Sequence, residues 1–310
     1  MPEQLTPEVA PAGTATREPE TPEPQAGPLF PVDSSTEPVV SVIVPTRDRR
    51  VLLQRKLQAL EIEQVDFEVI VVADACTDDT EKFLAEYRPP YRFTWTTGPG
   101  LHAATARNIG ASRARAPVLL FSDDDVIPDA GWVEDNRRLH EQPGFVGLSR
   151  QRLPPHLEVG DKLTAVHGWW NTNGRSTSVR ADLFHEAGGY DPAFSTYGGE
   201  DPDLGWRLKQ LGARFRLLTG ATVEHWDEQY LQNLEAKARS AGAAHVRVWR
   251  KHGAPQVAWA LGVHPVSLAI KRVLTGRWNA LFIGEDRYLW ERAYAAGARE
   301  ELRRAEDDHA

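Results

Sequence analysis

Short apolar runs that end in polar clusters recur along the first half of the chain. Residues 39–44, 67–72 and 118–121 are almost entirely Val, Ile, Leu and Phe. Runs of this length predict buried strands, and apolar residues that are continuous rather than alternating indicate a parallel sheet covered on both faces. Residues 91–95 predict a further, weaker strand.

Between these strands, apolar residues recur at helical spacing. Leu53, Leu57 and Leu60 share one face of the first predicted helix, and two more helices are predicted over residues 80–87 and 101–113. Strand, loop and helix alternate as in right-handed βαβ units, which build a parallel sheet. No Gly-x-Gly-x-x-Gly follows the first strand, so the pattern is that of a nucleotide-binding α/β sheet and not of its dinucleotide-binding version.

The pattern changes after residue 125, where helices and strands mix and the last third becomes mostly helical. We expect strands over 144–148, 176–179, 215–218 and 221–224. We expect helices over 132–141, 181–187, 202–211, 231–251, 266–274 and 286–304. The chain therefore divides into an α/β domain over 39–228, with a mixed central sheet flanked by helices, and a helical C-terminal extension over 229–310.

Composition changes abruptly before residue 39. Residues 1–38 hold nine of the 22 prolines and seven acids against one Arg, which accounts for −6 of the formal net charge of −8. Such a stretch buries too little apolar surface to offset its ordering entropy, so a disordered tail is predicted. The rest of the chain is nearly neutral and has no broad basic field, which excludes nucleic acid as an expected partner.

The chain shows no feature of a membrane-spanning or exported protein. No stretch reaches the roughly 18 apolar residues that a bilayer span requires, and the amino terminus lacks a signal-peptide pattern. The single cysteine, Cys76, fits a reducing compartment. We expect a cytoplasmic protein, and peripheral contact of a late helix with the inner face of the membrane stays open.

Acidic side chains gather where predicted strands end and where a helix begins. The three clusters are Asp74 with Asp78 and Asp79, Asp123 with Asp124 and Asp125, and Glu200 with Asp201. An isolated acidic run is more often a solvated turn. In an open α/β sheet, however, the carboxyl ends of the parallel strands lie at one edge, and ligands bind there. Hard carboxylate oxygens suit Mg²⁺ or Mn²⁺. The three clusters together predict a site where a cation neutralises a leaving diphosphate and a separate carboxylate deprotonates an acceptor hydroxyl.

Five ordered motifs then carry a resemblance that can be named. They are VIVPTR at 42–47, VVADACTDDT at 71–80, ARNIG at 106–110, FSDDD at 121–125 and GEDPDLGWRL at 199–208. In order and spacing they resemble the family 2 glycosyltransferases with the GT-A fold. The resemblance covers residues 40 to 226 and implies an inverting, metal-dependent transferase that uses a nucleotide-diphosphate sugar, with a UDP-sugar as the first expectation, and a glycan, lipid-linked or small-molecule acceptor.

The resemblance also implies roles for individual residues. The loop of Pro45, Thr46 and Arg47 would hold the nucleotide together with Asp74. Asp123 would contact the ribose or the metal, and Asp124 and Arg107 would lie on the nucleotide-sugar side. Asp125 would bind the metal, with His225 as a further ligand. Asp201 would be the catalytic base, and Glu200 beside it is a second candidate for a direct role.

Acceptor contacts are expected from Gly199 and from the aromatic residues Trp169, Trp170 and Trp206. Each of several residues could instead have a purely structural role. The tryptophans could be core residues, His225 could be structural, and Arg107 and Asn108 could fix a helix against the sheet. Asp74 could cap the turn before a helix.

Two departures from the family pattern bear on function. The first acid of the usual nucleotide loop is missing, because the chain reads Ala73-Asp74-Ala75-Cys76 there. The Gln-x-x-Arg-Trp element of processive synthases is also absent, since Leu274 stands where the Gln would precede Arg277 and Trp278. A non-processive transferase is therefore expected. The alternatives are a nucleotidyltransferase on a similar sheet and a catalytically silent carbohydrate-binding relative.

Overall fold

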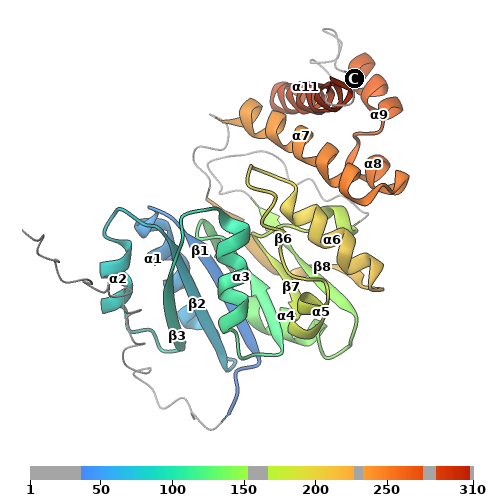
Figure 1. Ribbon diagram of the computed structural model, residues 1–310. Coiled ribbons are helices and arrows are strands. Elements are labelled where there is room, and N and C mark those ends of the chain that lie inside the picture. The colour runs from blue at the N-terminus through green and yellow to red at the C-terminus, as the bar shows by residue number, and fades with distance from the viewer. Residues whose placement is uncertain (1–35, 153–166, 227–232, 275–283, 308–310) are drawn as a thin grey trace, which may run out of the picture.

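A computed structural model describes residues 36–152, 167–226, 233–274 and 284–307 (Figure 1). The predicted tail at 1–38 lies almost wholly outside these residues, as does the expected domain boundary at 228. The described part contains one eight-stranded mixed sheet. In sheet order its strands are β3 (Arg92–Gly98), β2 (Phe67–Asp74), β1 (Val40–Thr46), β4 (Val118–Phe121), β7 (Thr177–Arg180), β6 (Phe145–Arg152), β8 (Arg214–His225) and β5 (Val126–Pro128).

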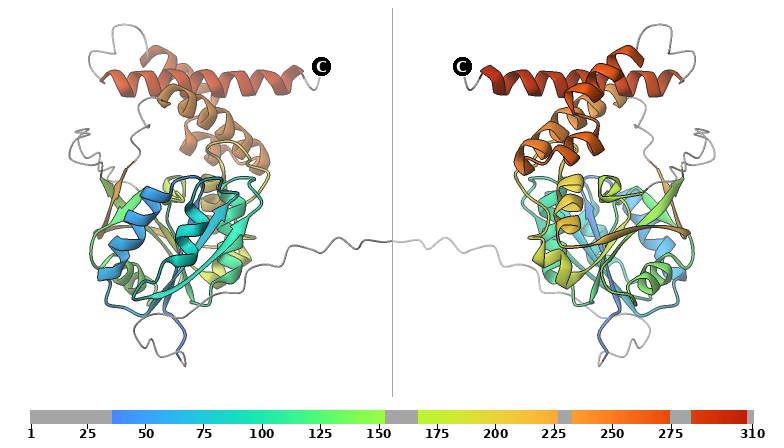
Figure 2. Two further views of the ribbon diagram at one scale, coloured as in Figure 1. Left: turned by 90° about the vertical axis from the view of Figure 1, so that its left-hand side faces the viewer. Right: turned by 90° about the vertical axis from the view of Figure 1, so that its right-hand side faces the viewer.

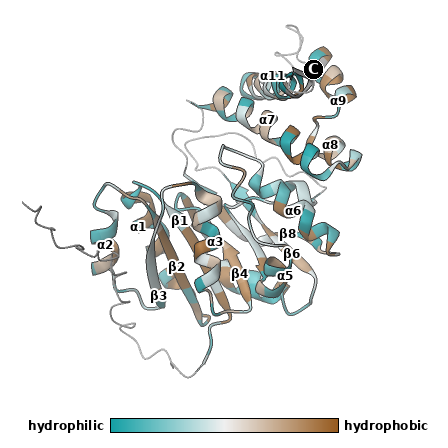
Figure 3. Cartoon of the chain, viewed as in Figure 1, coloured by the Kyte–Doolittle hydropathy of each residue, from teal (hydrophilic) through white to brown (hydrophobic). Residues whose placement is uncertain are grey.

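The parallel half of the sheet forms as the continuous apolar runs predict. β1 pairs in parallel with β2 and β4, and β2 pairs in parallel with β3. Every residue of β1, β2 and β4 is buried, and Figure 3 shows these strands as the apolar centre of the domain. The helices of this domain are α1 (Arg50–Ala59), η1 (Leu60–Ile62), α2 (Thr80–Glu86), α3 (Ala103–Arg113), α4 (Trp132–Leu139), η3 (Trp169–Asn171), α5 (Ala181–Glu186) and α6 (Glu200–Gln210).

One part of the sheet differs from the expectation. The two short strands expected at 215–218 and 221–224 are a single strand, β8, because its partner β6 runs past the Gly-containing stretch between them. Leu218 pairs with Ser149 and Val223 with Gln151, so a bulge absorbs the intervening residues without ending the strand. The short strand β5, which was not predicted, pairs with the end of β8 at His225.

The last third of the described chain is helical, as expected. It contains α7 (Leu234–His252), α8 (Pro255–Leu261), α9 (Pro265–Leu274) and α11 (Glu285–Asp307). α7 and α11 approach closely at two glycines, because a Cβ on Gly242 would collide with the backbone carbonyl of Tyr294, and one on Gly297 with that of Arg239. Figures 1 and 2 show these helices stacked above one end of the sheet.

A buried carboxylate joins the helical extension to the α/β domain. Asp203 of α6 is fully buried and pairs with Arg207 at 2.7 Å, with Lys251 at 2.6 Å and with His252 at 2.8 Å. Three partners from two helices compensate the desolvation of one carboxylate, so α7 has a fixed position against α6. Among the described helices, none has the length and apolar character needed to cross a membrane.

Candidate active site

One cleft of about 980 Å³ crosses the carboxyl ends of β1, β2 and β4 and extends to the C-terminal helices. It brings together the predicted acids Asp74, Asp123, Asp124, Asp125, Glu200 and Asp201. Asp78 and Asp79 are exposed and do not line the cleft, because they precede α2 and their carboxylates pair with its first turn and with Arg50. The acids from three distant parts of the sequence therefore share one cavity, whereas the outer two of the first cluster do not.

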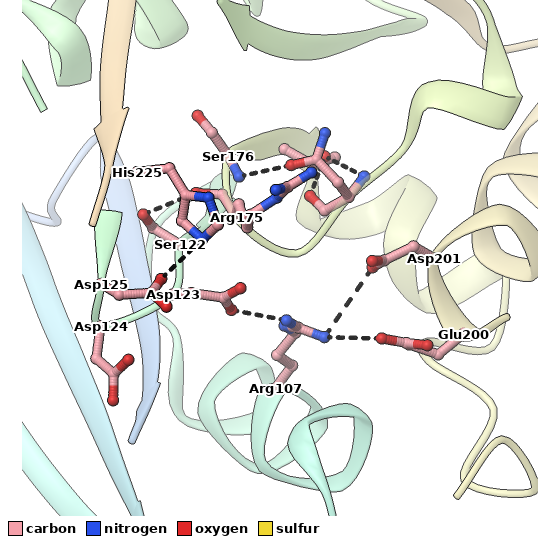
Figure 4. Close-up of polar contacts among 12 residues, drawn as sticks. Arg107, Ser122, Asp123, Asp124, Asp125, Arg175, Ser176, Glu200, Asp201 and His225 are labelled. Carbon is pink, nitrogen blue, oxygen red and sulfur yellow. Dashed lines mark hydrogen bonds and ion pairs between the residues drawn. The ribbon is translucent and has the colours of Figure 1, made fainter. Parts of the chain in front are cut away.

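Asp125 offers one carboxylate oxygen to the cleft. Its Oδ2 accepts a hydrogen bond from Arg49 at 2.8 Å, and its Oδ1 is buried with no hydrogen-bond partner among the described residues. His225, at the end of β8, places Nε2 3.6 Å from that Oδ1 (Figure 4). Burial raises the pKa of Asp125, but His225 and Arg49 outweigh it and hold the pKa at about 2. The carboxylate is therefore ionised at neutral pH.

Asp124 has a different environment from its two neighbours. Its carboxylate accepts hydrogen bonds from the Thr46 hydroxyl at 2.7 Å and from Arg49 at 3.2 Å. Burial raises its pKa to about 7, although Arg49 opposes the shift. Asp124 lines the cleft, and its oxygens also hold the loop after β1, so the structure adds a positioning role to the contact expected with the nucleotide sugar.

Arg107 links the two sides of the cleft. Its guanidinium is 2.7 Å from Asp123, 3.7 Å from Glu200 and 4.0 Å from Asp201 (Figure 4). The side chain is buried, lies 5.3 Å from the centre of the Tyr190 ring, and packs so closely on Gly174 that any Cβ there would collide with it. One arginine thus neutralises acids from two separate motifs, and it holds them within one network.

The first residues of α6 present Glu200 and Asp201 to the cleft. Gly198 and Gly199 precede them with φ values of 80° and 118°, which L side chains rarely adopt. Burial and the charge of Asp201 raise the pKa of Glu200 to about 8, while burial also raises the pKa of Asp201. At neutral pH Glu200 therefore keeps a proton, so the pair carries less negative charge than two ionised carboxylates would.

The predicted nucleotide loop lies at the opposite end of the cleft. Pro45, Thr46, Arg47 and Asp74 all line it. Asp74 also has the structural role that the sequence left open, because its Oδ1 accepts a hydrogen bond from the backbone N–H of Gly100 at 2.8 Å. Asn108 has a structural role too, since its amide exchanges hydrogen bonds of 2.8 and 2.9 Å with the backbone of Tyr190.

The three tryptophans expected at the acceptor side separate into two groups. Trp170 is 37% exposed and lines the cleft. Trp169 and Trp206 are only 2% and 7% exposed, and their rings pack against each other 5.0 Å apart in the core. The structure thus places both rings in the core and not at the cleft where acceptor contacts were expected, and η3 and α6 approach closely at Gly205.

Several cleft residues have no clear signal in the sequence. Arg49 follows the loop motif at the end of β1, and His245 and Trp290 lie on late helices, outside all five motifs. Lys56 lies behind the acidic run, fully buried, and donates a hydrogen bond of 2.5 Å to the Ser122 hydroxyl. Its position between Leu53 and Leu57 on the apolar face of α1 was the one available signal.

Replacing Lys56 with Met should stabilise the protein by up to about 4 kcal/mol at pH 6, because it removes a cation whose pKa is lowered by burial. Burial lowers the pKa of Lys56 to about 7, although Asp123, Asp125 and Asp124 oppose the shift. Below pH 7 the folded protein carries the full cost of a buried cation. As pH rises above 7, the folded state releases a proton that the unfolded state keeps up to about pH 10, so the wild type gains stability and the advantage of Lys56→Met shrinks.

Urea unfolding at pH 6 and pH 9 measures this difference. Lys82→Met, on the exposed side of α2, is the matched control and should change stability by less than about 0.5 kcal/mol at both pH values. A Lys56→Met protein less stable than the wild type at pH 6 would show that the neighbouring acids outweigh burial.

Comparison with known proteins agrees with this geometry. The profile of glycosyl transferase family 2 matches residues 41–194. A validoxylamine A glucosyltransferase of Streptomyces hygroscopicus is 28% identical over 75% of this chain and 66% of its own length. A pre-mycofactocin glycosyltransferase of Mycobacterium tuberculosis is 26% identical over 77% of this chain and 56% of its own. The chain thus spans just under two thirds of the first relative and just over half of the second.

Solved structures show the same fold. A mannosyltransferase from Pyrobaculum calidifontis, in complex with GDP-Man and Mn²⁺, superposes with a TM-score of 0.65 at 20% identity, covering 86% of this chain and 88% of that chain. S. aureus TarS, over its residues 1–349, gives a TM-score of 0.53 at 18% identity, covering 86% of this chain and 92% of that one. The family 2 profile thus matches this chain over residues 41–194, and the α/β domain has the GT-A fold.

Proposed function

We propose that this chain is a non-processive glycosyltransferase that moves a hexosyl group, with inversion, from a nucleotide-diphosphate sugar to an acceptor hydroxyl. Residues 39–228 form the catalytic domain and 229–310 the extension in this proposal. The single observation that carries it is that Asp125, Arg107 and Asp201 face one cleft at the carboxyl edge of the parallel strands. The free thiol of Cys76 fits a cytoplasmic location.

Asp125 and His225 supply two of the donor atoms that a divalent cation in the cleft would need. Asp125 Oδ1 is a buried oxygen with no hydrogen-bond partner among the described residues, and His225 Nε2 lies 3.6 Å away. Asp123 is the third candidate ligand, although Arg107 already occupies its Oδ1. Oxygen and imidazole donors suit Mn²⁺ or Mg²⁺. When bound, the cation would supply positive charge to the leaving diphosphate.

Different side chains bind the nucleotide, accept the proton and position the acids. Pro45, Arg47 and Asp74 border the nucleotide end of the cleft. Asp201 accepts the proton of the acceptor hydroxyl as its oxygen attacks the anomeric carbon. The bond from that carbon to the diphosphate breaks, and its electron pair leaves with the nucleoside diphosphate. Arg107 positions Asp201 and Glu200 beside the metal-side acid Asp123.

The matched relatives suggest the range of substrates to examine. Their names include a glucosyltransferase acting on validoxylamine A, and solved neighbours contain GDP-Man, UDP or UDP-GlcNAc. A UDP-sugar is the donor that we propose first, and a polyhydroxylated small molecule or glycan is the acceptor.

A donor screen tests the proposal directly. UDP-glucose, UDP-galactose, UDP-GlcNAc and GDP-mannose are each incubated with the protein, with Mn²⁺ or with EDTA, and the released nucleoside diphosphate is measured. One donor should give Mn²⁺-dependent release and a thermal shift, since a ligand at 100 times its dissociation constant adds about 2.7 kcal/mol. NMR of the anomeric proton in the product then reports inversion. Pyrophosphate release from a nucleoside triphosphate would instead identify a nucleotidyltransferase.

A further inference from the structure

The C-terminal helices form one wall of the catalytic cleft. Lys237, Ala241 and His245 of α7 line it at intervals of four residues, and Trp290 of α11 lines it beside them. No acid is among these four residues. This wall therefore differs in chemistry from the carboxylate-rich edge of the sheet, and it belongs to a part of the chain outside the region that the family profile matches.

The wall is fixed next to the residues that face the acceptor. A Cβ on Gly198 would lie 3.2 Å from the Cα of Ala241, so the turn before Glu200 rests directly on α7. Ser240 donates a hydrogen bond of 2.9 Å to the backbone carbonyl of Tyr197. Because this turn begins α6, the side chains of α7 have a set position relative to Glu200 and Asp201.

The hydrogen bonds of His245 determine which of its ring nitrogens can bind a ligand. The Tyr294 hydroxyl donates its only proton to the backbone carbonyl of Leu261 at 2.6 Å. His245 Nδ1, 2.7 Å from the same hydroxyl, must then be the donor of that contact. Burial and the charge of Lys271 lower the pKa of His245 to about 4, so the ring is neutral. Its Nε2 is consequently an unprotonated acceptor with no hydrogen bond to any described residue.

Two tryptophans line the same cleft as this acceptor. Trp290 and the half-exposed Trp170 line the same cleft, on the helical wall and on η3 respectively. A flat indole and a fixed hydrogen-bond acceptor suit a sugar ring, which has an apolar C–H face and hydroxyl donors around its edge. Neither feature suits an anionic or purely apolar ligand.

We infer that the C-terminal helices form half of the acceptor subsite, in which His245 Nε2 accepts a hydrogen bond from a hydroxyl of a saccharide whose ring packs on Trp290. This inference rests on the proposed function, because it assigns the acceptor class of the same cleft. It makes the helical extension a determinant of acceptor specificity, whereas the donor is held by the sheet edge.

Two substitutions of His245 separate binding from structure. Gln can place its amide oxygen near the position of Nε2, whereas Asn keeps a donor near Nδ1 for Tyr294 but does not reach the Nε2 position. Saturation-transfer NMR with cellobiose, maltose and trehalose, in the presence of UDP and Mn²⁺, measures saccharide binding. We expect a signal from at least one disaccharide with the wild type and with His245→Gln, and at least about tenfold weaker binding with His245→Asn and Trp290→Ala.

Two controls show whether a negative result counts against the acceptor subsite or against the proposed function. UDP binding by calorimetry with Mn²⁺, and the melting temperature of His245→Asn, should match the wild type. The inference is overturned if no disaccharide binds the wild type, or if His245→Asn binds disaccharides as well as His245→Gln does. Mn²⁺-dependent hydrolysis of a nucleotide sugar would persist in either case, and only its absence would count against the proposed function.

Discussion

Asp201→Asn should lower the rate of sugar transfer by about 10²–10⁴, with the affinity for the nucleotide unchanged. Asp201 is the second residue of α6 and faces the cleft, and its Oδ1 is buried with no hydrogen-bond partner among the described residues. Asn has the same shape but cannot accept the acceptor proton as a carboxylate does. Nucleotide binding should survive because the loop after β1 and Asp74 lie at the other end of the cleft. Transfer kinetics and calorimetry with UDP and Mn²⁺ measure the two effects separately.

Glu200→Gln is the matched control for this substitution. Glu200 keeps its proton at neutral pH, because burial and Asp201 raise its pKa to about 8, so Gln resembles the form already present. We expect it to retain transfer within about tenfold of the wild type. If Glu200→Gln abolished transfer and Asp201→Asn did not, the two carboxylates would have exchanged roles.

Asp125→Asn should abolish Mn²⁺ binding in the cleft and lower nucleotide-sugar turnover by at least about a hundredfold. Asp125 is the member of the acidic run whose pKa is held at about 2 and whose Oδ1 lacks a hydrogen-bond partner in the described structure, so it supplies the free anionic oxygen. An amide oxygen is a weaker ligand for a hard cation. Electron paramagnetic resonance of Mn²⁺ with UDP, at increasing protein concentration, measures the affinity.

Asp124→Asn tests whether the loss of Mn²⁺ binding is specific to Asp125 or follows from any substitution in the acidic run. Its carboxylate is occupied by Thr46 and Arg49, so this change should cost stability and leave Mn²⁺ affinity within about tenfold of the wild type. Equal Mn²⁺ affinity for Asp125→Asn and the wild type would remove Asp125 from the metal site.

The acidic clusters could be located from sequence because they follow apolar runs whose period and length define strands. β1, β2 and β4 appear where these runs predict them, and the motifs at their ends meet in one cleft. Local periodicity could not distinguish the acids within a cluster, and only the family resemblance gave them different expected roles. Asp123, Asp124 and Asp125 are identical side chains in a row, and only the tertiary structure gives them different partners, which are Arg107, Thr46 and His225 respectively.

The environments of the tryptophans and the positions of the late helices could not be predicted from local sequence patterns either. Trp169 and Trp170 are neighbours in the chain, yet one is core and the other lines the cleft, because α6 packs on only one side of η3. The sequence by itself determined the order of strands and helices from β1 to β4 and the residues at the ends of these strands, since these follow from local periodicity. Only the tertiary structure decided that α7 and α11 close the cleft, because that depends on long-range contacts, such as those at Asp203 and Gly198, which no local pattern encodes.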